Sequence, residues 1–274
     1  MADPFSKPGS NPNPYKPPSA TVADVRPATA QGTLADEPRA TGAGRGSSWW
    51  GEAWQLFKQA PGTWIRIVLI VFAILVVASL IPVASLVTYV LLPIFTAGIM
   101  LGCRALDQGE ELEVGHLFAG FKEQTGSLAL VGVLYTVSAV VVFAVVALLM
   151  LGGLGGLGLF LGGMTASDPG VERLGSMTFL LAMLLILALS IPLLMAVWFA
   201  PALVILHELS AIEAMRLSFV GCLRNTVPFL VYGVVGFLLA IGASIPLLLG
   251  WLVVGPMIFG SIYSGYKEIF LENA

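Results

Sequence analysis

The sequence predicts an all-α fold: a polytopic membrane protein whose six transmembrane helices form three parallel two-helix repeats, each preceded by a short amphipathic cytoplasmic helix. Three observations predict it: the composition, four long stretches without a charged residue, and a recurring Ser-Ile-Pro motif. Of the 274 residues, 57% are apolar and 11% are charged, and the mean hydropathy is +0.92. Soluble domains carry about 25% charged residues, so this chain has too few to cover a water-facing surface. The composition therefore disfavours a soluble enzyme, a nucleic-acid-binding protein and a disulfide-rich secreted domain.

A polar segment precedes the apolar part of the chain. Residues 1–48 contain eight of the 17 prolines and no tryptophan. Such a segment buries too little apolar area to offset the entropy lost on ordering, so we expect a disordered, proline-rich cytoplasmic tail. Its composition fits a solubilising tail, and the Lys16-Pro17-Pro18 stretch also fits a ligand for a partner domain.

The transmembrane helices are expected in four windows that lack Asp, Glu, Lys and Arg: 67–103, 124–167, 174–206 and 225–266. A spanning helix needs about 20 apolar residues, so the first and last windows can each hold two spans. Pro82 and Pro246 lie near the middle of these two windows, where we expect the turn between spans. The predicted spans are 63–81, 84–104, 127–150, 177–199, 227–245 and 248–267.

A glycine-rich insert at 151–176 follows the third predicted span. It contains two GxxxG spacings, Gly152/Gly156 and Gly158/Gly162. Small residues at this spacing allow close helix packing, but so many glycines weaken a helix. The insert is therefore either a flexible outer loop or short re-entrant segment, or a helix-packing motif.

The orientation follows from basic residues beside the spans, which concentrate on the cytoplasmic side of bacterial membrane proteins. With the tail in the cytoplasm, only Arg173 lies on an outer flank. Both termini are therefore expected in the cytoplasm, and the protein in the bacterial inner membrane. Basic residues at this membrane face can bind lipid headgroups. The candidate headgroup contacts are Lys58, Arg66, Arg104, Lys122, Arg216, Arg224 and Lys267.

An internal repeat is indicated by Ser79-Leu80-Ile81-Pro82, Ser190-Ile191-Pro192 and Ser244-Ile245-Pro246, each followed 9–11 residues later by another proline. Before each pair of spans lies a short amphipathic stretch with apolar residues at helical spacing, which predicts a helix in the plane of the membrane. The predicted units are about 49–106, 112–208 and 210–270. The motif could also recur by chance in a chain rich in Leu and Ile. The apolar residues of the three stretches are Trp50, Trp54 and Phe57; Val114, Leu117 or Phe118, and Phe121; and Ile212, Met215 and Phe219.

Residues for catalysis are not evident. The chain contains no nucleophile elbow, zinc-protease motif, phosphate-binding loop or dinucleotide fingerprint, so we expect neither enzymatic activity nor a cofactor. The span centres carry no ionisable side chain of the kind that marks proton and ion pathways. His116, His207 and Glu208 are weak candidates for a polar or metal site, and the alternative is that they cap helix ends at the membrane surface.

The third unit carries a resemblance to known proteins. Residues 210–219 (SAIEAMRLSF) and 222–225 (CLRN) resemble a signature of bacterial six-helix inner-membrane proteins, a group that includes membrane domains fused to some glycerophosphodiester phosphodiesterases. Residues 49–270 as a whole are similar to an uncharacterised proteobacterial transmembrane family, in which stretches like 101–107, 116–121 and 198–203 look typical. The resemblance implies the fold and an inner-membrane location, but no established activity.

The predicted function is that of a non-enzymatic integral inner-membrane protein, acting as an envelope, lipid-organising or membrane-complex component. The expected partners are membrane lipids and, as a further option, other membrane proteins, but not nucleic acid. The alternatives are a transporter or channel for an uncharged or amphipathic solute, and, more distantly, an enzyme acting on lipids.

Overall fold

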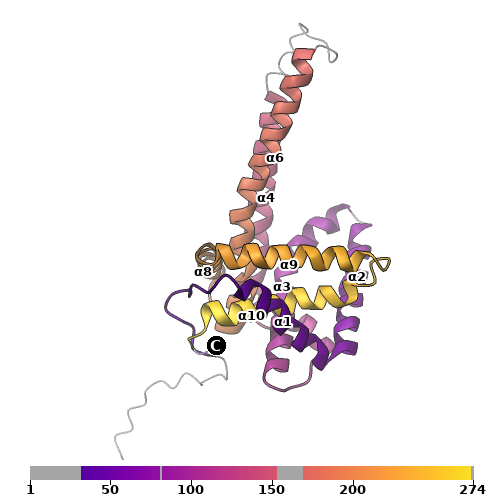
Figure 1. The fold of residues 1–274 in the computed structure, drawn as a ribbon, viewed down its shortest axis with the longest axis vertical. Helices are drawn as coiled ribbons and strands as arrows, with labels where there is room; N and C mark the ends of the chain where they lie inside the picture. Colours follow the sequence, from indigo (N-terminus) through magenta and orange to yellow (C-terminus); the bar gives the residue numbers. More distant parts are fainter. Residues whose placement is uncertain (1–31, 81, 153–168, 273–274) are drawn as a thin grey trace, which may run out of the picture. The chain divides into compact units, whose positions relative to one another are not determined.

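The computed structural model describes residues 32–80, 82–152 and 169–272, and within them the regular structure is helical (Figure 1). An isolated β-bridge between Leu34 and Leu271 adds to the helices. In chain order the helices are α1 (Arg45–Gln59), α2 (Pro61–Ser79), α3 (Pro82–Asp107), the 3₁₀ helix η1 (Val114–Phe121), α4 (Thr125–Gly152), α6 (Pro169–Trp198), α7 (Ala200–His207), α8 (Ala211–Arg224), α9 (Thr226–Ser244) and α10 (Trp251–Phe270).

Five of the predicted spans coincide with helices that are long and apolar enough to cross a membrane. They are α2, α3 from Val87, α4 to Leu149, α6 continuing through α7 (Ser176–His207), and α9. The sixth predicted span, 248–267, also falls on a helix, α10, but α10 is not among these five. Repeated Gly, Ser and Tyr lower its hydropathy, and more than half of its residues are buried against other helices.

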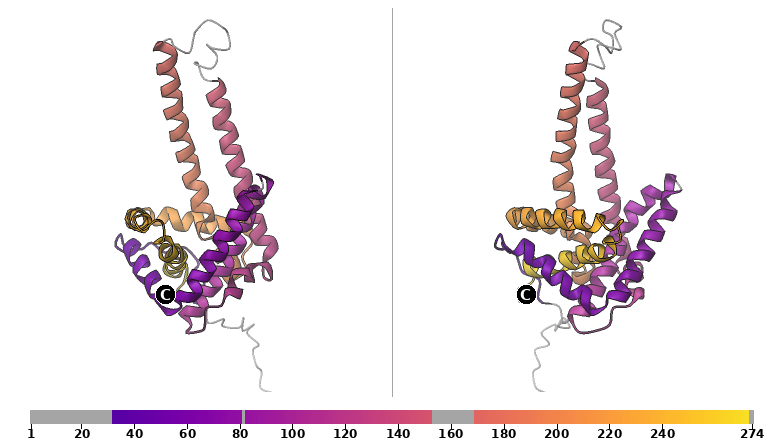
Figure 2. Two further views of the ribbon diagram at one scale, coloured as in Figure 1. Left: turned by 90° about the vertical axis from the view of Figure 1, so that its right-hand side faces the viewer. Right: turned by 45° about the vertical axis from the view of Figure 1, so that its right-hand side comes forward.

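The long helices pack on their neighbours in the chain: α2 with α3, α3 with α4, α4 with α6, and α9 with α10. Figure 2 shows α4 and α6 side by side, with their outer parts extending away from the other described helices. Apolar residues cover all sides of α4 and α6, and many of these side chains are exposed. Helices that are apolar on every side are typical of membrane spans.

The core lies where the inner ends of these pairs meet the shorter helices. α1 packs on α9 and α10, η1 on α3, and α8 on α6 and α7. Aromatic rings from several elements meet there, and buried rings of this size contribute strongly to packing. The largest fully buried side chains include Trp49, Trp64, Leu117, Phe199, Leu203, Tyr266 and Phe270.

Glycines allow the helix backbones to approach closely in this core. A Cβ atom at Gly132 of α4 would lie 2.3 Å from the Val90 carbonyl oxygen of α3. A Cβ at Gly98 of α3 would lie equally close to the His116 carbonyl oxygen of η1. Any larger residue at either position would push the two elements apart, so these glycines are required by the packing.

The segment before α1 differs from the prediction. Residues 32–44 lie along the end of α10, with backbone hydrogen bonds from Ala35 N to Phe270 O and from Arg39 N to Ile269 O, both 2.8 Å. Helix α1 then begins at Arg45. The prediction of a disordered segment up to residue 48 is therefore wrong for residues 32–48, because partners far along the chain supply their hydrogen bonds. Residues 1–31 lie outside the described part.

The glycine-rich insert is only partly described. Residues 153–168, with most of the two GxxxG spacings, lie outside the described residues. Residues 169–176, predicted as the end of the insert, are helical and form the beginning of α6. Helix α6 therefore begins eight residues before the fourth predicted span (177–199), whereas the part of the helix that is apolar enough to cross a membrane begins at Ser176.

The three short helices lie where the amphipathic stretches predict them, as α1, η1 and α8. The apolar residues that define the predicted stripes are not all buried in these three helices. Trp54, Phe118 and Phe121 are about two-fifths exposed, and Ile212 is 69% exposed. The inward side of α8 consists instead of small residues: Ala211, Ala214, Ser218, Gly221 and Cys222.

Candidate functional site

A break between α6 and α7 sets the geometry of the candidate site. The Ser218 hydroxyl of α8 donates to the Met195 carbonyl oxygen (2.6 Å) and accepts a hydrogen bond from the Phe199 amide (3.0 Å). In an uninterrupted helix that amide and that carbonyl would pair with each other. A side chain inserted into the helical hydrogen-bond ladder in this way bends a helix. Pro201, which has no N–H group, follows in the first turn of α7.

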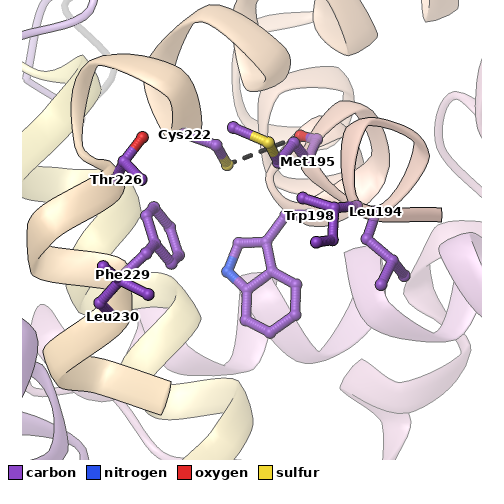
Figure 3. Close-up of a pocket in the computed structure, with 8 residues that line it drawn as sticks. Leu194, Met195, Trp198, Cys222, Thr226, Phe229 and Leu230 are labelled. Carbon is purple, nitrogen blue, oxygen red and sulfur yellow. Dashed lines mark hydrogen bonds between the residues drawn. The ribbon is translucent and has the colours of Figure 1, made fainter. Parts of the chain in front are cut away.

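An apolar groove of about 220 Å³ lies beside this break, between α6, α8 and α9 (Figure 3). The last two turns of α6 form one wall and the first turn of α9 forms the other, with Cys222 of α8 between them. Trp198 and Phe229 face the groove from opposite walls. The lining residues are Ile191, Leu194, Met195, Trp198, Cys222, Thr226, Phe229 and Leu230.

The hydroxyl and thiol groups of the groove are engaged within the protein, and the indole N–H of Trp198 is a further polar group of the lining. The Thr226 hydroxyl donates to the Leu223 carbonyl oxygen (2.8 Å), and the Cys222 thiol contacts the Met195 carbonyl oxygen (3.6 Å). Burial raises the pKa of the Cys222 thiol to about 12, although a hydrogen bond with Ser218 lowers it. The thiol is therefore neutral at physiological pH, and the groove offers an uncharged, apolar surface.

Helix α8 has three distinct sides beside this groove. Its small residues face the protein, whereas Ile212, Met215, Phe219 and Leu223 align along a second side at helical spacing. Ile212 and Leu223 are 69% and 56% exposed. A third side carries the charged residues Glu213 and Arg224, and Arg216 lies between this side and the apolar one; all three are exposed. A helix with an exposed apolar side next to a charged side is typical of the membrane surface.

Two of the predicted headgroup contacts are ion-paired within the protein. Lys267 lies 2.7 and 2.8 Å from the two carboxylate oxygens of Asp107. Arg224 lies 2.7 Å from the Glu37 carboxylate and also donates to the Pro38 carbonyl oxygen. These contacts hold α10 to α3 and α8 to the segment before α1. Of the remaining predicted contacts, Arg104 is partly buried in the last turn of α3, and the exposed ones are Lys58, Arg66, Lys122 and Arg216.

The weaker candidates, His116, His207 and Glu208, do not come together in one site. His116 Nδ1 accepts a hydrogen bond from the Glu113 amide (3.0 Å) and so caps η1. His207 hydrogen-bonds to the Tyr266 hydroxyl, and Glu208 is exposed at the end of α7 with a φ of 56°. Among the described residues, no three His, Cys, Asp or Glu side chains are grouped so that they could hold a metal ion.

Asn225 is a buried residue with several hydrogen bonds, and its role was not predicted from the sequence. It is 0% exposed and lies between α8 and α9. Its amide nitrogen donates to the carbonyl oxygens of Arg39 and Gly221, and its oxygen accepts from both the amide and the hydroxyl of Thr41, all at 2.8–2.9 Å. The one local signal was an Asn at a helix boundary, where this residue often hydrogen-bonds to the backbone.

A comparison with known proteins supports a location in the membrane. A curated protein of Burkholderia thailandensis, described as a probable inner membrane protein, is 32% identical to this chain over 204 residues. The match covers 73% of this chain and 74% of that protein. No protein-family profile and no solved structure matches the chain.

The apolar helices and this relative define the class: the chain is a multi-pass protein of the bacterial inner membrane. It belongs to the same family as the probable inner membrane protein of B. thailandensis. The predicted membership of a bacterial inner-membrane family is thereby confirmed.

Proposed function

We propose that the protein is a non-enzymatic, lipid-organising component of the inner membrane that holds short helices in the surface of one leaflet. The three-sided character of α8 carries this proposal. Small residues fix the helix to α6 and α7, while an apolar side and a charged side remain exposed next to each other. An anchored helix of this kind places apolar side chains among acyl chains and charges among headgroups.

The packing at the centre further supports a lipid-organising role over transport. The inner ends of the helix pairs meet in a core of large rings and close glycine contacts. Within the described residues, every buried side-chain nitrogen and oxygen atom has a hydrogen-bond partner. A polar solute pathway instead requires buried polar groups that are available to the solute.

The topology that we propose has six crossings, with both termini in the cytoplasm. The hydrogen bonds between residues 33–39 and 269–272 support it, because they place the chain on the same side of the membrane before α1 and after α10. Two ends on one side require an even number of crossings. Five helices qualify by composition alone, so α10, shielded from lipid by its neighbours, supplies the sixth.

The repeat of three units is part of the same proposal. Each unit would consist of a short helix and a pair of long ones: α1 with α2 and α3, η1 with α4 and α6–α7, and α8 with α9 and α10. The packing of α2 on α3, α4 on α6 and α9 on α10 supports this division, and α3 also packs on α4 across the first two units. The resemblance to membrane domains fused to phosphodiesterases would then concern the membrane part alone.

The test determines where α8 lies relative to lipid. Single cysteines are introduced at Ile212 and Leu223 on the apolar side, at Glu213 on the charged side and at Arg216 between the two, and each is spin-labelled in vesicles of phosphatidylethanolamine and phosphatidylglycerol. We expect labels at 212 and 223 to be accessible to oxygen dissolved in the bilayer, the label at 213 to be accessible to a water-soluble nickel complex, and the label at 216 to be intermediate. Equal exposure of all four labels to the nickel complex would contradict the proposal.

A second measurement addresses what α8 does to lipids. The full chain is purified from native membranes in mild detergent, and its bound lipids and proteins are identified by mass spectrometry. The I212D/L223D variant should retain fewer lipids than wild type, whereas E110Q, at an exposed residue between α3 and η1, should retain the same amount. A reproducible protein partner would indicate a role in a membrane complex, and equal lipid retention by all variants would argue against a lipid-organising one.

A transporter for an uncharged or amphipathic solute is the second candidate, and the apolar groove between α6, α8 and α9 is the observation that favours it. Purified protein in sealed vesicles would then accelerate entry of such a solute. If the solute enters at the same rate in protein-free vesicles, this candidate is excluded.

A further inference from the structure

We propose that the groove between α6, α8 and α9 is a binding site for one acyl chain of a phospholipid. The inference deepens the proposed lipid-organising function and rests on it for the placement of α8. Two walls of the groove belong to membrane-crossing helices, and the third element is α8. The groove is therefore continuous with the lipid-facing surfaces of α6 and α9, where exposed Leu194 and Leu230 mark its edges.

The chemistry of the lining selects an apolar ligand. The described lining has no charged side chain, and its hydroxyl and thiol groups both contact backbone carbonyl oxygens. A polar solute would lose most of its hydrogen bonds to water, because the Trp198 indole N–H can replace at most one of them, and this loss is unfavourable. A hydrocarbon chain has no such requirement.

The groove is large enough for only part of an acyl chain. Sites that enclose drug-sized ligands measure about 300–1,000 Å³, whereas this groove measures about 220 Å³. It accommodates a segment of an acyl chain whose remainder stays in the bilayer. Because the groove lies at the ends of α6 and α9 next to α8, the segment is the part near the headgroup.

The rigidity of the groove distinguishes it from the rest of the lipid-facing surface. Ser218 fixes the end of α6 through Met195 and Phe199, so the α6 wall is held relative to α8. The ring of Trp198 packs edge-on against that of Phe229, with centroids 6.1 Å apart. A preformed groove of this kind binds a chain with a smaller loss of conformational entropy in the protein.

The test blocks the groove and counts retained lipid. Thr226→Trp places a large ring in the groove, and Val227→Trp places the same ring on the neighbouring residue of α9, which does not line it. Both positions are exposed, so both variants can accommodate the ring. Each protein is passed through gel filtration in mild detergent, and its bound phospholipid is quantified by mass spectrometry.

We expect wild type and V227W to retain one phospholipid per chain more than T226W, with retention at this site at least fivefold lower in T226W. Leu230→Trp, at the other edge of the groove, should reproduce the loss. Equal phospholipid retention in all four proteins, or retention of a free fatty acid or an isoprenoid in place of phospholipid, would overturn the inference. If the spin labels on α8 keep their two-sided pattern while phospholipid retention is unchanged, the groove inference fails and the proposed function stands.

Discussion

At the scale of single residues, Asn225 shows how one buried side chain can join distant parts of the chain. Three of its four hydrogen bonds connect the end of α8 to residues 39 and 41, more than 180 positions earlier, and the fourth goes to the Gly221 carbonyl oxygen of α8. All the donors and acceptors of its amide group are close to partners, which offsets the unfavourable burial of a polar group. The side chain therefore fixes the segment before α1.

Replacing Asn225 by Ala should reduce the free energy of unfolding in detergent by about 2–4 kcal/mol, because several buried backbone groups lose their partner. Thr41→Val removes only one of the four hydrogen bonds and should have a smaller effect. Amide exchange at residues 39–41 should accelerate in N225A. Unchanged exchange there would mean that other contacts hold the segment.

The Cys222 thiol allows a prediction on pH. Because its pKa in the folded protein is raised to about 12, the reactive thiolate is scarce below that pH. We expect negligible maleimide labelling of Cys222 between pH 6 and 9, while a cysteine introduced at exposed Ser47 labels readily. Above pH 9 the unfolded state loses its thiol proton and the folded state keeps it, so this group lowers stability as pH rises. Fast labelling of Cys222 at pH 7 would contradict the burial.

At the scale of elements, the break between α6 and α7 depends on a neighbouring helix. Ser218 takes the place of a hydrogen bond that α6 would otherwise make within itself. The bend therefore depends on α6 and α8 together. Neither Pro192 nor Pro201 takes part in the two hydrogen bonds of Ser218 that interrupt the helix. It also positions Trp198 and Met195 in the groove.

Ser218→Ala should reduce the free energy of unfolding by about 1–3 kcal/mol, because the buried Phe199 amide and Met195 carbonyl lose their shared partner. Ser79→Ala removes an exposed hydroxyl that donates to the Val76 carbonyl oxygen, and should change stability by less than about 0.5 kcal/mol. Differential scanning fluorimetry in detergent compares the two variants. Equal melting temperatures would show that the α6–α7 break is maintained without Ser218.

The contact between α3 and α4 provides a second prediction at this scale. Gly132→Ala would bring a methyl group within 2.3 Å of the Val90 carbonyl oxygen, and should lower stability by about 1–3 kcal/mol or more. Gly233→Ala in the middle of α9 meets nothing within 4 Å, and should be neutral or stabilising because Ala favours a helix. Chemical unfolding in detergent should separate the two. A G132A protein as stable as G233A would contradict the close packing.

At the scale of the whole molecule, the contact between the two ends of the described chain constrains the topology to one in which both lie on the same side of the membrane. Arg39 donates to the Leu271 carbonyl oxygen, and Glu272 N to the Thr33 carbonyl oxygen. No membrane can separate residues that hydrogen-bond to each other. This constraint does not depend on the hydropathy of any helix.

Reporter fusions test this topology. Green fluorescent protein, which folds in the cytoplasm, should fluoresce when joined to either end of the chain. Alkaline phosphatase, which is active only outside the inner membrane, should be active when inserted between α4 and α6. Activity of alkaline phosphatase at one terminus and fluorescence at the other would contradict six crossings.

The sequence was sufficient to predict most long helices, because each apolar window is long enough for one or two membrane-spanning helices of about 20 residues. It did not predict which side of each short helix is buried. Ile212 follows the amphipathic pattern but is exposed, because in a membrane protein the apolar side can face lipid while small residues face the protein. The roles of Asn225 and of residues 33–41 could not be predicted, since their partners are distant in sequence.

The contact between residues 33–41 and the end of α10 also constrains how the protein is made. Residues 33–39 leave the ribosome well before the backbone groups at 269–272 with which they pair. Until α10 is complete, the early segment has no partner there. This part of the contact therefore closes only after α10 is synthesised, and a chain that stops before residue 269 would insert its earlier helices and hold residues 37–41 through Arg224 and Asn225, but would leave residues 33–35 without these partners.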